Sequence, residues 1–373
     1  MSKLKIGIVG CGNIAMTKHL PNLAKYAGRC EIVAFCDIVE SKAIAACEKY
    51  GAPGAKVFTD YRDLIKEDLD AVHVCTPNRS HSEISIAALE AGKNVMCEKP
   101  MAINAKEALA MVEAAERTNR LLTIGYQNRF RVDTQTLKKM ADQGELGEIY
   151  MAKAHATRRR GIPTWGVFTN KFEQGGGPLI DIGTHSLDIT LWVMDNYAPV
   201  AVTGSTYNKL GTTLEGDQQG TDEHWDPKTY EVEDAAYGFI KFENGATVFL
   251  ESSWALNTTD ERQAMTTVYG TKAGAAMEYP LGVKGTERVL RVNTVVNGRQ
   301  AILEPNVSER AAHASGDLIF NYPGAEKEAA VWLDALEGKG ELVVKPRQAY
   351  TVTRILEAIY ESARTGKTVF FEN

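Results

Sequence analysis

The chain has 373 residues, which is too long for a single ordinary hydrophobic core, so we expect two domains. Hydrophobic residues make up 44% and charged residues 24% of the chain, as in globular proteins, and the formal net charge is −6. An acidic chain lacks the basic face that nucleic acids require, and no apolar run approaches the ~18 residues that span a bilayer. We therefore expect no nucleic-acid partner and no membrane partner.

All six cysteines lie between Cys11 and Cys97, and no two of them form a C-x-x-C pair. A secreted disulfide framework would distribute them differently, and a zinc site would space them more tightly. The first ten residues form a strand-like apolar run without a cleavage site, which argues against a signal peptide. These features predict reduced, mostly buried thiols in a cytoplasmic protein.

The first third of the chain alternates between short apolar runs and helical patterns. The apolar runs, each typical of a buried strand, are KLKIGIVG (3–10), CEIVAFCD (30–37), DAVHVCTP (70–77), KNVMCEKP (93–100) and RLLTIGY (120–126). Helical patterns such as SEISIAALEAG and AKEALAMVEAAERT lie between them. This alternation predicts an α/β fold whose doubly wound parallel sheet is covered on both faces. Sites in such sheets lie beyond the carboxyl ends of the strands.

The first strand end carries GCGNIA (10–15), a G-x-G-x-x-G/A pattern between a strand and a helix. Gly10 permits a tight turn, and Gly12 lets a pyrophosphate approach backbone N–H groups at the start of the helix, next to Asn13 and Ile14. This context predicts a dinucleotide-binding site.

Asp37 closes the second strand, where an acid hydrogen-bonds the ribose hydroxyls of NAD and repels the 2′-phosphate of NADP. We therefore expect NAD rather than NADP. The alternative is that Asp37 only caps the helix beginning near Ser41.

CTPNRSH (75–81) follows the next predicted strand end. Its position predicts a loop that faces the cofactor through Thr76, Pro77, Asn78 and His81. The alternative is ordinary helix initiation, with Ser80 as the N-cap.

NVMCEKPMA (94–102) places Glu98 and Lys99 where a buried strand ends. Lysine is rarely buried without a partner, and Pro100 stiffens the turn that follows. A stiff turn can hold an ammonium group in one place, as a catalytic lysine requires. The alternative is a surface Glu–Lys pair beside a turn proline.

From about residue 128 the pattern changes to a helix followed by alternating strands, with a hairpin signal at ENG (243–245). This predicts a second α/β domain with a large, mostly antiparallel sheet. One face of that sheet can pack on helices, and the other could meet a partner subunit.

GGGPLIDIGTHSLDITLWVM (175–194) reads as an apolar, buried helix, yet Asp181, His185 and Asp188 lie on one stripe of it. Buried acids need partners. Asp181 and His185 could form a structural polar network or a catalytic pair, because a carboxylate can tune and orient a histidine. A metal site is the weaker alternative, since no third and fourth ligands with suitable spacing are present. We expect no metal.

RRRGIPTWGVF (158–168) is predicted to form a loop that is either a solvated basic segment or a flap over the site, with Trp165 as an apolar wall. The polar, glycine-rich segment 211–231 reads as a mobile excursion or a subunit-contact arm.

GIVGCGNIA (7–15), CEKPMA (97–102) and GGPLIDIGTHSLD (176–188) together resemble the glucose–fructose oxidoreductase and inositol dehydrogenase (Gfo/Idh/MocA) family. The resemblance extends over nearly the whole chain. It implies NAD- or NADP-dependent oxidation or reduction of a hydroxyl on a sugar, an inositol or a related polyol. It also implies homodimers or homotetramers, which we expect to form through the C-terminal sheet.

The same resemblance implies a Rossmann domain over 1–126 and a substrate-binding and oligomerisation domain over 127–346. The last helix, about 347–365, is expected to pack back on the first domain.

The resemblance assigns the chemistry to three residues. His185 is the expected general base, Lys99 is expected to stabilise the developing alkoxide, and Asp181 is expected to orient His185 or bind a neighbouring hydroxyl. The residues expected to contact the cofactor are Gly10, Gly12, Asn13, Ile14, Asp37, Thr76, Pro77, Asn78, His81, Glu98, Lys99, Gln127 and Trp165. The residues expected to contact the substrate are Arg129, His155, Arg158, Thr164, Trp165, Asp181 and His185.

Two other functions use the same scaffold. One is an NAD-dependent glycosidase that oxidises a sugar carbon transiently, and the other is a cofactor-bound sensor without catalysis. The presence of both Lys99 and His185 argues against the sensor, and turnover of free NAD would separate the dehydrogenase from the glycosidase.

Overall fold

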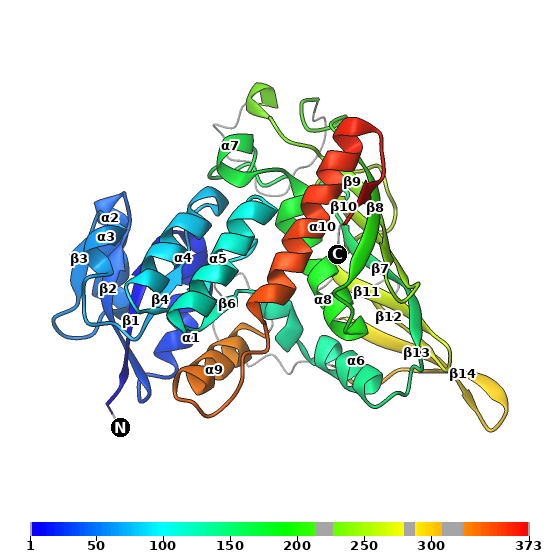
Figure 1. Cartoon of the computed structure of the whole chain (residues 1–373), viewed down its shortest axis with the longest axis horizontal. Coiled ribbons are helices and arrows are strands. Elements are labelled where there is room, and N and C mark those ends of the chain that lie inside the picture. Colours follow the sequence, from blue (N-terminus) through cyan, green and yellow to red (C-terminus); the bar gives the residue numbers. More distant parts are fainter. Residues whose placement is uncertain (1, 214–226, 280–287, 308–321, 323, 372–373) are drawn as a thin grey trace. The chain divides into compact units, whose positions relative to one another are not determined.

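The structure is a computed structural model that describes residues 2–213, 227–279, 288–307, 322 and 324–371. The chain forms two compact units, each with one β-sheet (Figure 1). Unit 1 comprises Met1–Phe130 and His313–Tyr350, and unit 2 comprises Arg131–Ala312 and Thr351–Asn373. Most of the segment 211–231, including His224 and Trp225, lies outside the described residues.

Unit 1 contains a six-stranded parallel sheet in the order β3-β2-β1-β4-β5-β6. Its strands are β1 (Leu4–Val9), β2 (Cys30–Cys36), β3 (Lys56–Phe58), β4 (Ala71–Val74), β5 (Asn94–Cys97) and β6 (Leu122–Ile124). The order reverses between β1 and β4, which is the doubly wound arrangement that binds dinucleotides at the reversal point. The predicted Rossmann fold class is confirmed.

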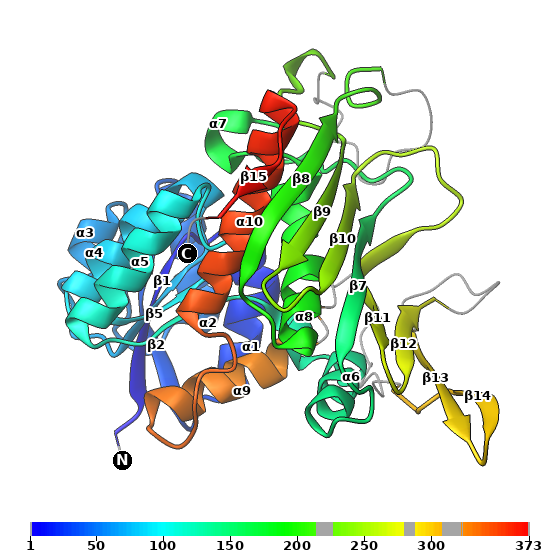
Figure 2. The ribbon, with the colours of Figure 1, turned by 45° about the vertical axis from the view of Figure 1, so that its right-hand side comes forward.

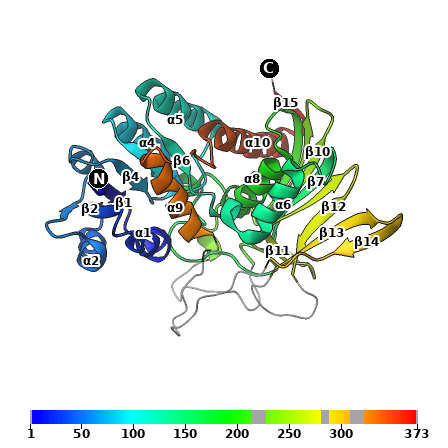
Figure 3. The same ribbon diagram turned by 90° about the horizontal axis from the view of Figure 1, so that it is seen from below.

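Helices cover this sheet on both faces. The helical segments of unit 1 are η1 (Ala15–His19), α1 (Leu20–Ala24), α2 (Glu40–Tyr50), α3 (Tyr61–Leu64), η2 (Asn78–Ser80), α4 (His81–Glu90), α5 (Ala105–Thr118), η3 (Gln127–Phe130) and α9 (Ala325–Leu336). One core cluster joins Ile8 and Phe35 of the sheet to Leu20 of α1 and Leu333 of α9. The helices α4 and α5 pack together away from α1 and α2 (Figure 3).

Unit 2 contains a nine-stranded sheet in the order β14-β13-β12-β11-β7-β10-β9-β8-β15. Only the β7–β10 pair is parallel among its described neighbours, so the predicted mostly antiparallel sheet is confirmed. The strands are β7 (Ile149–Thr157), β8 (Pro199–Tyr207), β9 (Ala235–Phe242), β10 (Thr247–Ser253), β11 (Arg262–Gly270), β12 (Gly274–Glu278), β13 (Val289–Val296), β14 (Arg299–Leu303) and β15 (Val369–Phe370).

One face of this sheet is covered by helices (Figure 2). The helical segments of unit 2 are α6 (Val132–Asp142), α7 (Lys171–Gln174), η4 (Leu179–Gly183), α8 (Thr184–Met194), η5 (Pro227–Thr229) and most of α10 (Pro346–Thr365). No helix in the described part of the chain covers the opposite face, where Tyr237 and Phe249 are 38% and 43% exposed.

The helix expected at 347–365 is α10, and it is divided between the two units. Only residues up to Tyr350 group with unit 1, whereas Ile359 lies against Gly204 and Gly238 of the sheet in unit 2. The described C-terminal residues that group with unit 1 are therefore α9 and those up to Tyr350.

All six cysteines are free, and five of them are buried. Burial raises the pKa of the thiols of Cys11 and Cys36 to about 12 and that of Cys30 to about 11, and it raises the pKa of Cys75 and Cys97 as well. Cys47 is half-buried, and burial raises its pKa too. These thiols are therefore protonated at neutral pH.

None of the helices in the described part of the chain is long and apolar enough to cross a membrane. The same residues contain no group of three or more His, Cys, Asp or Glu side chains that could hold a metal ion.

Candidate active site

The glycine turn follows β1 and leads directly into η1. Gly10 has φ = 88°, and a Cβ at this position would lie 2.6 Å from the carbonyl oxygen of Cys75, so only glycine allows this close approach of two strand ends. A Cβ on Gly12 would meet nothing within 4 Å, and Asn13 beside it is exposed. The turn thus leaves open space at its outer side, as the predicted approach of a pyrophosphate requires.

Asp37 lies beside this turn, immediately after β2. One carboxylate oxygen accepts a hydrogen bond from the Cys11 N–H at 2.9 Å, and the other accepts from the Val39 N–H at 2.9 Å. The side chain therefore shapes the glycine turn as well as placing a negative charge at the edge of the sheet.

The loop after β4 contains Thr76, Pro77 and the buried Asn78. The Thr76 hydroxyl is buried and has no hydrogen-bond partner among the described residues. His81 was expected to bind the cofactor, but its two ring nitrogens lie 2.7 Å from the Pro100 carbonyl oxygen and 2.9 Å from that of Thr76. His81 therefore connects the loop after β4 to the turn after β5, and its predicted cofactor contact stays a prediction.

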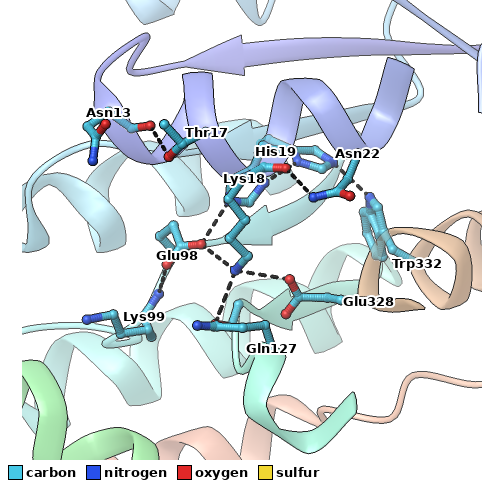
Figure 4. Close-up of polar contacts among 12 residues, drawn as sticks. Asn13, Thr17, Lys18, His19, Asn22, Glu98, Lys99, Gln127, Glu328 and Trp332 are labelled. Atoms are coloured by element: carbon cyan, nitrogen blue, oxygen red, sulfur yellow. Dashed lines mark hydrogen bonds and ion pairs between the residues drawn. The ribbon is translucent and has the colours of Figure 1, made fainter. Parts of the chain in front are cut away.

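Glu98 was also expected at the cofactor, and the structure shows its partners within the protein. Its buried carboxylate accepts hydrogen bonds from Lys18 Nζ at 2.7 Å, from His19 Nε2 at 2.8 Å and from the Lys99 main-chain N–H at 3.1 Å (Figure 4). Burial alone would raise the pKa of Glu98, but the Lys18 ammonium and the bond from His19 hold it well below its usual range. An ionised Glu98 thus holds the main chain of Lys99.

Lys99 itself is half-buried after the end of β5. In Figure 4 its main-chain nitrogen faces Glu98, while its side chain extends away from Lys18. Two lysines therefore lie at this edge of the sheet with different surroundings. Lys18 is buried in an ion pair with Glu98, and the side chain of Lys99 extends away from it.

The segment η3 contains two side chains with predicted contacts to cofactor or substrate, Gln127 and Arg129. Gln127 is buried and its amide oxygen lies 3.4 Å from Lys18 Nζ, so it stands next to Glu98. Arg129 is completely buried, and it donates to the Val343 carbonyl at 2.9 Å and to the Gln348 amide oxygen at 2.7 Å. Arg129 therefore holds the C-terminal segment of unit 1, and its predicted substrate contact stays a prediction.

Asp181 and His185 lie in unit 2 where the π-helical turn η4 passes into α8, and both are buried with 9% exposure. The Trp254 indole N–H donates to an Asp181 carboxylate oxygen at 3.1 Å. Ser252 on β10 donates to the Pro178 carbonyl at 2.7 Å, which fixes the start of η4 on the sheet. The predicted pair is thus held at a helix junction, and π-turns often occur at functional sites.

Arg158 and His155 are close in sequence, but their side chains contact different groups. Arg158 is half-buried, and desolvation lowers its pKa while the negative charge of Asp181 opposes that shift, so the two groups interact. Its guanidinium donates to the Gln263 amide oxygen at 2.9 Å. His155 instead bonds to Glu251 and Thr267, next to the open-face groove of the sheet.

The alternation along β7 explains this difference. Ala154 and Ala156 are completely buried toward the helices, so His155 between them faces the other side of the sheet. The structure thus brings Arg158, and not His155, to Asp181. The substrate contact predicted for His155 stays a prediction, and its described partners are Glu251 and Thr267.

The loop 158–168 is anchored at one point and exposed at another. Ile162 is completely buried in a cluster with Ile182 and Trp254, and Thr164 is buried as well. Trp165 is 38% exposed, with its ring centroid 6.0 Å from that of Phe168. The contacts predicted for Thr164 and Trp165 are still a proposal.

Two family models match this chain. The one described as "Oxidoreductase family, NAD-binding Rossmann fold" matches residues 4–126, and the one described as "GFO/IDH/MocA C-terminal domain" matches residues 134–276. The chain belongs to the GFO/IDH/MocA oxidoreductase family.

Relatives within this family include dehydrogenases of sugars and cyclitols. The chain is 37% identical over 372 residues to "D-glucoside 3-dehydrogenase" of Escherichia coli (strain K12), covering 99% of this chain and 97% of the relative. It is 34% identical over 218 residues to "Inositol 2-dehydrogenase" of Salmonella typhimurium, covering 58% of this chain and 62% of the relative. The crystal structure of an aldose-aldose oxidoreductase from Caulobacter crescentus, complexed with glycerol, aligns with a TM-score of 0.76 at 26% identity over 99% of this chain and 100% of that one.

This member of the GFO/IDH/MocA family is an NAD-binding oxidoreductase, and the residues at the edge of unit 1 fit that cofactor. The space beside Gly12 can admit a pyrophosphate, and Asp37 carries the negative charge that suits unphosphorylated ribose. The buried Thr76 hydroxyl, without a partner among the described residues, is a donor that a cofactor oxygen could satisfy.

Sequence reasoning missed the buried polar cluster beneath this edge. It consists of Lys18, His19, His73, Glu98, Glu328 and Trp332. Two local signals were present: a Lys-His pair inside the first apolar helix, and a histidine inside the apolar strand AVHV. Neither signal identifies its partners, because these lie far away along the chain.

Proposed function

We propose that the protein oxidises a secondary hydroxyl of a sugar, a glycoside or a cyclic polyol, with NAD as the hydride acceptor. The observation that carries this proposal is the position of Lys99. It lies at the carboxyl end of β5, where Glu98 accepts a hydrogen bond from its main-chain N–H. The full-length similarity to a D-glucoside 3-dehydrogenase makes a D-glucoside, oxidised at C3, the first substrate to test.

The chemistry assigned to the chain's own residues has two parts. When bound, NAD supplies a nicotinamide that accepts hydride. The Lys99 ammonium stabilises the negative charge that develops on the substrate oxygen, and His185 takes the hydroxyl proton as general base. Asp181, fixed by Trp254, orients His185 or binds a neighbouring hydroxyl. Arg158 near Asp181 is a candidate for a further substrate contact.

The first experiment screens substrates. D-Glucosides, free glucose and myo-inositol are incubated with NAD or NADP, and the formation of reduced cofactor is followed by absorbance. We expect turnover of free NAD with at least one of these compounds. Hydrolysis of the glycoside without net NADH would instead identify the glycosidase.

The second experiment tests the catalytic residues on the substrate that the screen finds. Lys99→Ala should lower kcat by ~100-fold or more, because it removes one charge-stabilising donor. His185→Ala should lower it by ~100- to 10,000-fold through loss of the general base. NAD affinity, measured by fluorescence titration, should persist in both variants. Near-full activity of either variant would contradict the assigned roles.

We also propose that the protein forms a homodimer or homotetramer through the open face of the nine-stranded sheet. Side chains on this face line a groove of about 860 Å³, which includes Tyr237, Phe239 and Phe249. Exposed aromatic residues of this kind are typical of subunit interfaces. Phe249→Glu should lower the mass measured by light scattering, whereas Ile44→Glu on α2 should not. A Phe249→Glu variant of unchanged mass would contradict this interface.

We further propose that the protein acts in the cytoplasm. Its six free cysteines support this location, because disulfides are rare in that reducing compartment. Detection of the protein in a secreted or periplasmic fraction would contradict it.

A further inference from the structure

The carboxylate of Glu98 is held by groups from three parts of unit 1. Lys18 and His19 of η1 contact one oxygen, and the Lys99 main-chain N–H contacts the other. A Cβ added at Gly125 would lie 2.9 Å from Glu98 and 3.1 Å from Lys18 Nζ, so the cluster also packs against the backbone after β6. Glu98 therefore has a fixed position next to the main chain of Lys99.

The hydrogen bonds from Trp332 through His73 and His19 to Glu98 can all be donated in the same direction, toward Glu98. Trp332 on α9 has only a donor, and its indole N–H donates to His73 Nε2 at 3.0 Å. Burial lowers the pKa of His73 well below its usual range, so its ring is neutral and its proton is on Nδ1. That N–H donates to His19 Nδ1 at 2.9 Å, which leaves the His19 proton on Nε2 to donate to Glu98.

Lys18 adds a positive charge beside this series of hydrogen bonds. Its ammonium lies 2.7 Å from Glu98 and 3.0 Å from Glu328 of α9, and the two carboxylates raise its pKa although burial opposes them (Figure 4). It also lies 3.4 Å from the Gln127 amide oxygen. Lys18 thus keeps Glu98 ionised, and an ionised carboxylate is the strongest acceptor for the His19 and Lys99 N–H groups.

We propose that Trp332, His73 and His19 form a one-directional hydrogen-bond relay that, together with Lys18, positions Glu98 and through it the main chain of the catalytic Lys99. None of these four residues is assigned a contact with substrate or cofactor, so they are positioning residues. The inference rests on the proposed role of Lys99. It gives α9, more than 200 residues from Lys99 along the chain, a role in the reaction.

The test compares two replacements of His73. His73→Gln keeps one acceptor and one donor, whereas His73→Leu removes both at similar volume. We expect His73→Leu to lower kcat by up to about tenfold, the effect of one lost hydrogen bond, with KM and NAD affinity within about twofold. His73→Gln should recover most of kcat. Trp332→Phe should resemble His73→Leu, and Trp192→Phe in unit 2 is the matched control with unchanged kcat.

A double-mutant cycle then asks whether the relay acts through Lys99. Adding His73→Leu to Lys99→Ala should lower kcat no further, because the group that the relay positions is already absent. Nitrogen NMR of the unmutated protein should find the His73 proton on Nδ1. A His73→Leu protein with wild-type kcat, or additive losses in the double variant, would overturn the relay. Full activity of Lys99→Ala would instead overturn the proposed function, so the two failures are distinguishable.

Discussion

Asp37 uses one carboxylate for two purposes. It accepts a hydrogen bond from the Cys11 N–H, which fixes the glycine turn, and one from the Val39 N–H just before α2, and its charge faces the place where the ribose of a dinucleotide is expected. The sequence predicted the charge effect, but it gave no sign of the bonds to the turn.

Two replacements of Asp37 separate these effects. Asp37→Asn keeps one acceptor oxygen and removes the charge, so NADP binding should improve relative to NAD while the turn is retained. Asp37→Ser shortens the side chain, so it should also weaken NAD binding through loss of the turn contacts. Dissociation constants for NAD and NADP, measured by fluorescence titration, check both outcomes. Equal affinities for NAD and NADP in the unmutated protein would refute this role of Asp37.

The distance between partners along the chain explains which site residues could be predicted. Gly10, Gly12 and Asp37 follow a local pattern, so their places could be read directly. The protein partners of Glu98 and Arg129 follow from no local pattern: Lys18 lies 80 residues from Glu98, and Gln348 lies 219 residues from Arg129. The sequence could therefore suggest that a polar residue near a strand end meets a ligand, but it could not predict the partners of that residue within the protein.

At the scale of elements, the junction of η4 and α8 depends on the glycines that precede it. The Glu233 carboxylate accepts hydrogen bonds from the N–H groups of Gly177 and Leu179 and from the Tyr360 hydroxyl. A carboxylate at this position suits the positive end of a helix. The Gly177 carbonyl in turn accepts from the Asp181 N–H at 3.0 Å, which connects this cap to the predicted catalytic pair.

Gly177→Ala should disturb this junction. The added Cβ would lie 2.3 Å from the Glu233 carbonyl oxygen, and overpacking of this kind typically costs ~1–3 kcal/mol. We expect a lower thermal midpoint and a lower kcat, because Asp181 moves with the turn. Gly28→Ala is the matched control, since a Cβ there meets nothing within 4 Å. Equal midpoints for the two variants would show that Gly177 is not under this constraint.

The sequence predicted one buried helix over 175–194, and the structure contains a π-turn followed by α8. Apolar periodicity identifies a buried helix but does not distinguish a π-turn at its start, because that turn depends on Glu233, which precedes β9, and on Ser252 of β10. Likewise, β3 with three residues and β15 with two are too short to give a pattern of their own.

At the scale of the whole molecule, the buried charges predict how stability changes with pH. The folded-state pKa of Glu98 lies well below 4.5, so its contribution is fully present above that value and is lost as the pH falls through the folded pKa. Glu233 and Glu328 act in the opposite sense, because burial raises their pKa and their contribution is lost as the pH rises through the raised values.

Glu98→Gln isolates the first contribution. At pH 7 the free energy of unfolding should fall by ~3–5 kcal/mol, because Lys18 loses its charged partner in the interior. The difference from the unmutated protein should shrink as the pH falls below 4.5, because Glu98 of the unfolded chain then binds a proton that the folded protein does not yet bind. Urea unfolding followed by circular dichroism between about pH 3 and 7 measures the difference. A difference that stays constant over this range would contradict the low pKa of Glu98.

The placement of the cysteines makes the opening of unit 1 separately observable. All six thiols lie between Cys11 and Cys97, so the whole sequence assigned to unit 2 contains none. Five of them are buried and protonated at neutral pH, so an alkylating reagent reacts with them only after the surrounding structure opens. The alkylation rate, followed by mass spectrometry, therefore measures the opening of the nucleotide-binding unit alone. The decrease of this rate on addition of NAD measures how much the cofactor stabilises that unit against opening.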